Sequence, residues 1–266
     1  MREGFGDMPP KLSAVVVAQN EEKNIERCLR SLRFADETVV VDAFSEDGTA
    51  EIARSHGARV FSRAWDGFAT QKQFAIEQAK GDWILLVDAD EEASADLAAE
   101  IRALVDRAPD AAPAGYRVRR ENFFLGAPVR HGPWRKDQNV RLFRKGKGSV
   151  SQRPVHEGIV LSGDAGTLRA PLFHYTHQTL SESFRRLNRY TTLEASEREA
   201  RRPVGLVDVA VPPLGVFLRY YIIGGCWKAG TRGFLLSAIT AMYRSVLYAK
   251  TYLRQTEGRA HKAPHA

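Results

Sequence analysis

The segment that most constrains the fold is "WILLVDADEE", residues 83–92, an apolar run that ends in four carboxylates over five positions. The run from Trp83 to Val87 has the composition of a strand buried on both faces of a parallel sheet. Ligands of open α/β sheets bind outside the carboxyl ends of the strands, which is where Asp88 and Asp90 stand. Paired carboxylates at such a position predict a divalent cation, and oxygen ligands favour Mg²⁺ or Mn²⁺.

Strand-like and helix-like segments alternate along the first 108 residues. Strands are predicted at 13–18, 38–42, 58–63 and 82–88, with helices between them at 21–32, from about 47 to 56, and at 70–81. In the first helix, apolar residues recur at helical spacing, at Ile25, Cys28, Leu29 and Leu32. Helical crossovers between strands predict an α/β fold with a mainly parallel sheet and helices on both faces.

The pattern changes after the helix at 94–108. Segments such as 116–126, 139–145 and 155–161 are short, mixed and bounded by turns, which predicts antiparallel strands added at the edge of the sheet.

The two parts also differ in charge. Residues 1–114 have 13 Lys and Arg against 22 Asp and Glu, whereas residues 115–266 have 26 against 10. An acidic part suits metal binding, and a basic, aromatic part suits phosphate groups, nucleic acid or an anionic membrane face. Because the basic segments contain no recognisable nucleic-acid reading motif, we do not expect nucleic acid as the partner.

Beyond a charged helix at 180–202 lie two apolar stretches, 204–227 and 233–253. Prolines 212 and 213 and the charges of Asp208, Arg219 and Arg244 interrupt them, so neither gives the uncharged run that a spanning helix needs. We expect helices lying in the membrane interface, and the alternative is that they pack on the α/β domain as core. A disordered tail is expected from 255 to 266.

The cysteines and the first residues bear on the compartment. Cys28 and Cys226 are far apart and belong to no CxxC pair, which fits packing roles in a reducing compartment. The start, "MREGFGDMPPKLS", has no apolar core of a signal peptide. We expect a protein on the cytoplasmic side of the membrane.

Three polar loops follow three of the predicted strands: "AQNEE" at 18–22, "VDAFSEDGT" at 41–49 and "DAD" at 88–90. Together with "FATQKQFAIEQAKGDWILLVDADEE" and "RPVHEG", they resemble the inverting family 2 glycosyltransferases of the GT-A fold, and within them the lipopolysaccharide core β-1,4-glucosyltransferases. The resemblance covers residues 12 to about 175. One departure is Gln73, where the family pattern has Asn.

The resemblance implies a domain organisation and a Rossmann-like GT-A sheet. A flexible N-terminus (1–11) precedes a glycosyltransferase domain (12–178), which consists of a nucleotide-sugar half (12–108) and an acceptor half (115–178). A helical, membrane-proximal appendage (179–254) and the tail follow. The implied partners are a nucleotide-sugar donor, a lipid-linked saccharide acceptor and an anionic membrane surface.

The resemblance also assigns residues to the donor. Asp42 would accept hydrogen bonds from uracil, and the remaining donor-binding residues would be Asn20, Glu21, Ser45, Asp47, Lys72, Asp88 and Arg141. Taken alone, Asn20 and Asp47 are equally well suited to start helices, and Lys72 to a solvated helix face. Glu91 and Glu92 are expected to cap the next helix.

Inverting transfer needs a stabilised leaving group and a base for the acceptor hydroxyl. The resemblance makes Asp90 the main ligand of Mg²⁺ or Mn²⁺, with Asp88 and His174 beside it, and Arg141 or Arg144 could add positive charge. Glu157, next to His156, is the expected base, and Asp137 is a second acid in this half. An exposed Glu157 and a structural His174 are the alternatives.

The predicted function is transfer of glucose from UDP-glucose to a lipid-linked core oligosaccharide. One alternative keeps the chemistry with a polyprenyl-phosphate or capsule acceptor. Another is a non-catalytic, nucleotide-sensing membrane adaptor, which would need no base at Glu157. A phosphatase of the haloacid dehalogenase type is not favoured, because its DxD follows the first strand and here the motif follows the fourth.

Overall fold

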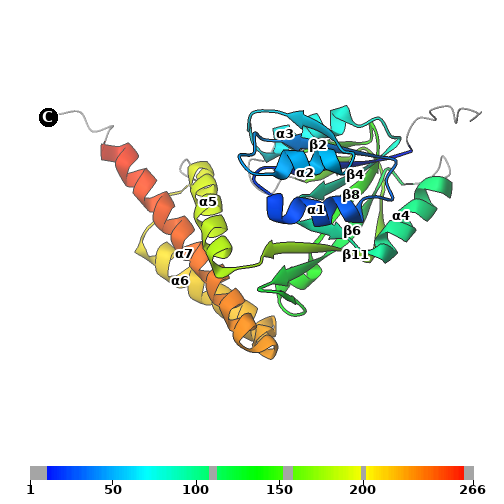
Figure 1. Ribbon diagram of the computed structural model, residues 1–266. Coiled ribbons are helices and arrows are strands. Elements are labelled where there is room, and N and C mark those ends of the chain that lie inside the picture. The colour runs from blue at the N-terminus through cyan, green and yellow to red at the C-terminus, as the bar shows by residue number, and fades with distance from the viewer. Residues whose placement is uncertain (1–10, 108–112, 152–157, 199–201, 261–266) are drawn as a thin grey trace, which may run out of the picture. The chain divides into compact units, whose positions relative to one another are not determined.

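A computed structural model describes residues 11–107, 113–151, 158–198 and 202–260 (Figure 1). The chain forms two compact units. The first comprises Met1–Glu121 and Lys136–His174, and the second comprises Asn122–Arg135 and Tyr175–Ala266. The predicted division of the glycosyltransferase domain near residues 108–115 stays a prediction.

The first unit contains the parallel strands that the sequence predicts. They are β1 (Leu12–Ala18), β2 (Glu37–Asp42), β3 (Arg59–Ser62) and β4 (Trp83–Asp88), in the order β3-β2-β1-β4. The connecting helices are α1 (Glu22–Ser31), α2 (Thr49–Ser55) and α3 (Phe68–Gln78). Parallel pairing aligns Ala18 with Asp42 and Val17 with Asp88, so the strand-end loops meet at one edge of the sheet.

Antiparallel strands extend this sheet beyond β4, as expected. They are β8 (Gln138–Arg144), β6 (Gly115–Phe124), β11 (Ala165–His177) and β5 (Glu91–Ala93), in that order, and β7 (Ala127–Pro128) pairs with β6. A separate pair is formed by β9 (Gly148–Val150) and β10 (Ile159–Leu161). The α/β fold with a central sheet, flanking helices and C-terminal helices is therefore confirmed.

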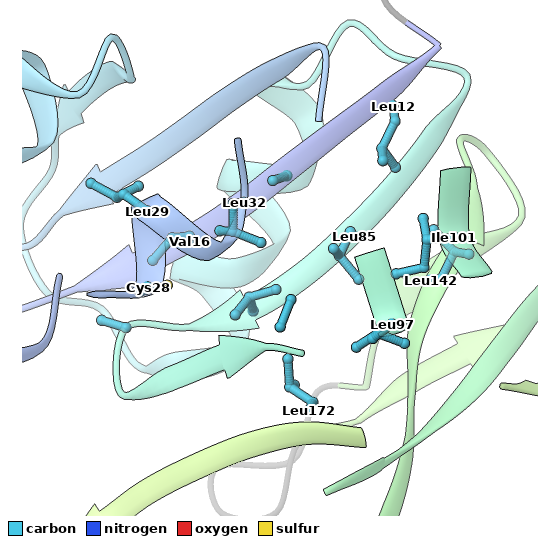
Figure 2. Close-up of a cluster of buried hydrophobic side chains, with 14 of the residues drawn as sticks. Leu12, Val16, Cys28, Leu29, Leu32, Leu85, Leu97, Ile101, Leu142 and Leu172 are labelled. Atoms are coloured by element: carbon cyan, nitrogen blue, oxygen red, sulfur yellow. The ribbon is translucent and has the colours of Figure 1, made fainter. Parts of the chain in front are cut away.

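The core lies on both faces of the parallel strands because β1 alternates its buried side chains between them. Leu12 and Val16 face α1 and α4 (Ala95–Arg107), whereas Val15 faces α3. Figure 2 shows the first of these clusters, in which the helical stripe of α1 meets Leu85 and the α4 residues Leu97 and Ile101. The predicted spacing of Ile25, Cys28, Leu29 and Leu32 is thus confirmed as a buried face.

The second unit contains the C-terminal helices. These are α5 (Leu180–Arg198), α6 (Leu206–Leu218), a π turn (Arg219–Ile223), a 3-10 turn (Cys226–Ala229) and α7 (Gly230–Ala260). Helix α7 continues past residue 254, where a disordered tail was expected to begin. Of the described residues, one helical segment, Leu206–Ile223, is long and apolar enough by length and composition to cross a membrane, which corrects the expectation that neither stretch is.

Glu37 links four segments at the amino end of the parallel strands. Its carboxylate accepts hydrogen bonds from Ser13 Oγ (2.5 Å), from Arg59 (2.8 Å) and from the backbone N–H of Lys80. Burial raises the pKa of Glu37, but these donors outweigh it and hold the pKa below its ordinary value. The folded chain therefore stabilises the ionised carboxylate of Glu37 more than the unfolded chain does.

We predict that Glu37→Gln lowers the free energy of unfolding by about 1–2 kcal/mol at neutral pH. Because the folded pKa is depressed, the contribution is present above the unfolded pKa of about 4.3 and is lost as pH falls below it. Urea unfolding of wild type and variant across this range checks the prediction. The exposed Glu51→Gln is the control, and a difference from wild type that persists unchanged at low pH would contradict the argument.

Candidate active site

The loops after β1 and β2 are held together by polar side chains. Asp42, at the end of β2, is buried and accepts hydrogen bonds from the backbone N–H (3.1 Å) and Oγ (2.5 Å) of Ser45. Ser45 Oγ in turn accepts from the backbone N–H of Asn20, and Asn20 Oδ1 accepts from the backbone N–H of Glu46 at 2.8 Å. Both carboxylate oxygens of Asp42 retain lone pairs for a further donor.

Of the two residues expected to start helices, Asn20 and Asp47, only Asp47 caps a helix in the structure. Asn20 lies outside α1, in the left-handed region with φ 55°, which Asn adopts more readily than most residues. Asp47 precedes α2, and its carboxylate accepts from the first backbone N–H of both helices, those of Glu22 (3.2 Å) and Thr49 (3.1 Å). Glu21 is attached to the same loop through its backbone N–H, which donates to Thr49 Oγ1.

Two cationic side chains pair with the acidic turn at the end of β4, residues 88–92. Asp88 pairs through one oxygen with Lys72 Nζ of α3 at 2.8 Å and through the other with Arg141 of β8 at 2.9 Å. Lys72 is buried, not a solvated helix residue, and Arg141 is only 5% exposed. The two cations lie at the end of β4 where the parallel strands open.

Glu91 extends this pair into a chain of charges. Its carboxylate is fully buried, 2.6 Å from Arg141 and 3.3 Å from Arg120 of β6, and Arg120 pairs with Asp137 at 2.6 Å. Its second oxygen accepts from the backbone N–H of Asp88, which closes the turn. The expectation that Glu91 caps the next helix is wrong, because it lies in β5, and Ser94 Oγ accepts from the backbone N–H of Leu97 at the start of α4.

Glu92, the other expected cap, also lies in β5. Its carboxylate is 3.7 Å from Arg27 of α1. It therefore faces a helix before the acidic turn and not the start of α4.

The two acids that share Arg141 have pKa values shifted in opposite directions. Burial raises the pKa of Asp88, but the charges of Arg141 and Lys72 outweigh it and hold that pKa well below its ordinary value. Burial raises the pKa of Glu91 as well, and the repulsion from Asp88 adds to the rise despite Arg141. Asp88 is therefore the firmly ionised member.

Asp90 and His174 form a second pair beside the charged chain. Asp90 is 5% exposed, and its Oδ1 lies 3.5 Å from His174 Nε2, because pairing of β11 with β5 places His174 opposite Glu91. Among the residues that the structure describes, no three His, Cys, Asp or Glu side chains form a metal-binding group. Asp88, which was also expected to contact the metal, instead pairs with Lys72 and Arg141. Asp90 and His174 offer two donors, which fits an ion that takes its other ligands from substrate phosphates.

The two arginines of "VRLFR" are separated by the register of β8. Leu85 of β4 pairs with Leu142, and Trp83 pairs with Arg144, so Arg141 and Arg144 lie toward opposite ends of β4, about 10 Å apart. Arg144 stacks on the Trp83 ring at 4.9 Å. Arg144 is thereby placed away from the acidic turn and does not share the site with Arg141.

Other predicted residues fall outside the cluster. Glu157 and His156 lie outside the described residues. Gln73 faces β9, where its side chain accepts from the backbone N–H of Val150 at 3.1 Å. Cys28 is buried beneath the turn and donates to the carbonyl of Asp88, and burial together with the nearby acids raises the pKa of its thiol.

Arg120 and Glu91 are the site residues that sequence reasoning missed. Arg120 is one of three arginines in "YRVRREN", residues 116–122, and nothing in that pattern separates it from the other two. Its burial against Glu91 depends on pairing between β6 and β8, which includes a register shift after Tyr116. The signal available for Glu91 was its position as an acid directly after the DxD.

We predict that Arg141→Gln lowers the free energy of unfolding by about 3–5 kcal/mol, because it leaves Asp88 and Glu91 buried without the cation between them. Arg144→Gln, on the same strand, removes a cation–π contact and should cost about 1 kcal/mol. Denaturant midpoints of both variants at neutral pH check this. Equal losses would contradict a special role for Arg141.

Comparisons with known proteins identify the family of the chain. The model of the glycosyl transferase family 2 matches residues 13–160. A lipopolysaccharide core biosynthesis glycosyltransferase, LpsC of Rhizobium meliloti, is 36% identical, over 93% of this chain and 94% of its own length. An uncharacterized glycosyltransferase of Rickettsia bellii is 30% identical over 90% of this chain and 85% of its own length.

Among solved structures, Staphylococcus aureus TarS in complex with UDP-GlcNAc aligns with 14% identity and a TM-score of 0.48, covering 96% of this chain and 93% of that one. The match to the family model takes in β1 to β4, the acidic turn and β8. The chain belongs to glycosyl transferase family 2 and is a glycosyltransferase.

Proposed function

We propose that the chain is an inverting, metal-dependent transferase that moves glucose from UDP-glucose to a lipid-linked core oligosaccharide in lipopolysaccharide synthesis. The observation that carries the proposal is the position of the buried Asp88–Lys72–Arg141 cluster beside the Asp90–His174 pair, at the edge where β1, β2 and β4 end. Cations and a carboxylate–imidazole pair at one edge suit a nucleoside diphosphate with a divalent ion.

Donor binding is assigned to the loops of the parallel strands. Asp42, fixed by Ser45, would accept a hydrogen bond from the N–H of uracil, and Asn20, Glu21 and Asp47 would shape the loops around the base and ribose. Their hydrogen bonds to one another hold this pocket wall before the donor arrives, which reduces the ordering cost of binding.

The diphosphate would lie against the cations of the acidic turn. Lys72 and Arg141 each have more N–H donors than the single oxygen of Asp88 that they face, so they can retain Asp88 and donate to phosphate. Asp90 and His174 would hold the Mg²⁺ or Mn²⁺. When bound, that ion supplies Lewis-acid neutralisation of the charge that develops on the leaving diphosphate.

Inversion requires one displacement at the anomeric carbon. The acceptor hydroxyl forms the new bond to that carbon as the bond to the UDP oxygen breaks, and Glu157 takes the hydroxyl proton. Glu157 is assigned by resemblance of "RPVHEG" to the family pattern. Asp137 is less suited to this role, because its carboxylate pairs with Arg120.

The name of the Rhizobium relative supports a lipid-linked core oligosaccharide as the acceptor. That protein is named a lipopolysaccharide core biosynthesis glycosyltransferase, and it resembles this chain over nearly its whole length. A Haloferax volcanii relative, named as a hexosyltransferase, is 36% identical over 32% of this chain and supports a hexose donor. A polyprenyl-phosphate or capsule acceptor remains the alternative with the same chemistry. Family membership favours a transferase over the non-catalytic adaptor.

We predict metal-dependent UDP release from UDP-glucose, in preference to UDP-galactose, UDP-N-acetylglucosamine and GDP-mannose. Asp90→Asn should reduce the rate on the order of a hundredfold or more, because the leaving diphosphate loses its neutralising ion. Glu92→Gln, two residues away and paired with Arg27, is the matched control and should leave the rate near wild type. A preference for another donor would correct the sugar, and metal-independent release would contradict the metal assignment.

Glu157→Gln tests the base. We expect transfer to fall by about 10²–10⁴-fold while UDP affinity, measured by calorimetry, stays unchanged. Asp164→Asn, an exposed acid in the same part of the chain, serves as the control. Full activity of Glu157→Gln would move the base to another acid.

A further inference from the structure

Helix α6 and the π turn after it expose a continuous apolar stripe. The stripe consists of five side chains spaced four, three, four and four residues apart, so they share one face. They are between 54% and 71% exposed, and they are Val207, Val211, Leu214, Leu218 and Ile222. Leu206 and Ile223, at the two ends, are each 82% exposed. A contiguous apolar face of this kind marks an interaction surface.

The opposite face of α6 is already occupied by α7. Phe217 and Tyr221 pack edge-on against Phe234, with ring centroids 5.6 and 5.8 Å apart. Figure 1 shows α6 and α7 running side by side along this contact. The α6 stripe is therefore the face that α7 does not cover.

Both ends of α6 are attached to other parts of the second unit. Before its start, the side chain of Gln255 on α7 accepts from the backbone N–H of Val204 at 2.9 Å and donates to the carbonyl of Arg202 at 3.1 Å. Beyond its end, the carbonyl of Gly224 accepts from the backbone N–H of Gly132 at 2.8 Å.

The start of α7 is attached to the same segment. Arg232 donates to the carbonyl of Leu125 at 3.2 Å, and Cys226 is buried among Phe124 and Leu236. If α6 crossed a bilayer, the segment bonded to its far end would have to enter the bilayer with it or lose these hydrogen bonds. Each polar group left unpaired there would cost several kcal/mol. An orientation parallel to the membrane keeps all of them.

Past Asp208, which lies in the first turn of α6 and pairs with Arg202, the charge along the stripe has one sign. Residues 209–256 contain six Lys and Arg and no Asp or Glu. Exposed Arg219 and Lys228 flank the end of the stripe, together with Trp227, which is 53% exposed. Cations and an indole beside an apolar face are the composition of helices that lie at the surface of anionic bilayers.

We propose that the α6 stripe is a monotopic membrane-binding surface, which enters the boundary of an anionic bilayer while α6 lies parallel to it. The inference deepens the proposed function, and it rests on that function for its purpose, because the surface would bring the enzyme to a lipid-linked acceptor. The binding itself requires neither donor nor acceptor, so its test is separate from the test of transfer.

The test is flotation of the full chain with vesicles of phosphatidylcholine, with and without phosphatidylglycerol. Wild type should bind the anionic vesicles, bind the neutral ones much more weakly, and be released by salt or alkaline carbonate. Leu214→Glu with Leu218→Glu should weaken binding on the order of a hundredfold, because two leucines no longer enter the bilayer.

The matched control is Leu180→Glu with Leu193→Glu, which changes two exposed leucines of α5 outside the stripe and should bind like wild type. Circular dichroism establishes that both variants are folded. Quenching of Trp227 by brominated lipid, judged against Trp227→Phe, tests the same surface in the otherwise unchanged chain.

Absence of binding, equal binding by the Leu214/Leu218 variant, or retention in the bilayer after carbonate extraction would each overturn the proposal. Vesicle binding without UDP release from any donor would instead leave this surface in place and reject the proposed function.

Discussion

The site depends on one buried cation, Arg141, held between Asp88 and Glu91. Desolvation makes an unpaired acid at either position unfavourable, so the guanidinium is what permits two carboxylates to stand together at the end of β4. Arg120 and Asp137 continue the alternation of charge. The acidic turn is thus a fixed array of both signs, in which no reorganisation is needed before an anionic ligand arrives.

Strand pairing places this array. Parallel pairing of β1 with β2 and β4 brings Asp42 and Asp88 to one edge, and the antiparallel strands then supply what the parallel half lacks. β8 contributes Arg141, β6 contributes Arg120, and β11 contributes His174. Part of the positive charge of residues 115–266 is therefore internal, because Arg120 and Arg141 neutralise acids of the first part of the sequence.

The parallel half could be predicted from the sequence because its signals are local: apolar runs, helical spacing and polar loops each lie within a few residues. Glu91, Arg120 and the separation of Arg141 from Arg144 could not be predicted, because each depends on which residues face one another across antiparallel strands far apart in the chain. Asn20 was misplaced for a different reason. Asn is a residue type that caps helices, but here the carboxylate of Asp47, in the neighbouring loop, accepts from the first backbone N–H of α1 in place of Asn20.

The central claim is that the cations at the end of β4 receive a nucleoside diphosphate. Calorimetric titration of wild type with UDP and with uridine, in the presence and absence of Mn²⁺, tests it most directly. We predict that UDP binds far more tightly than uridine, and that Lys72→Met removes most of the difference while uridine binding is unchanged. Equal affinity for uridine and UDP, or an unchanged preference in Lys72→Met, would contradict the account.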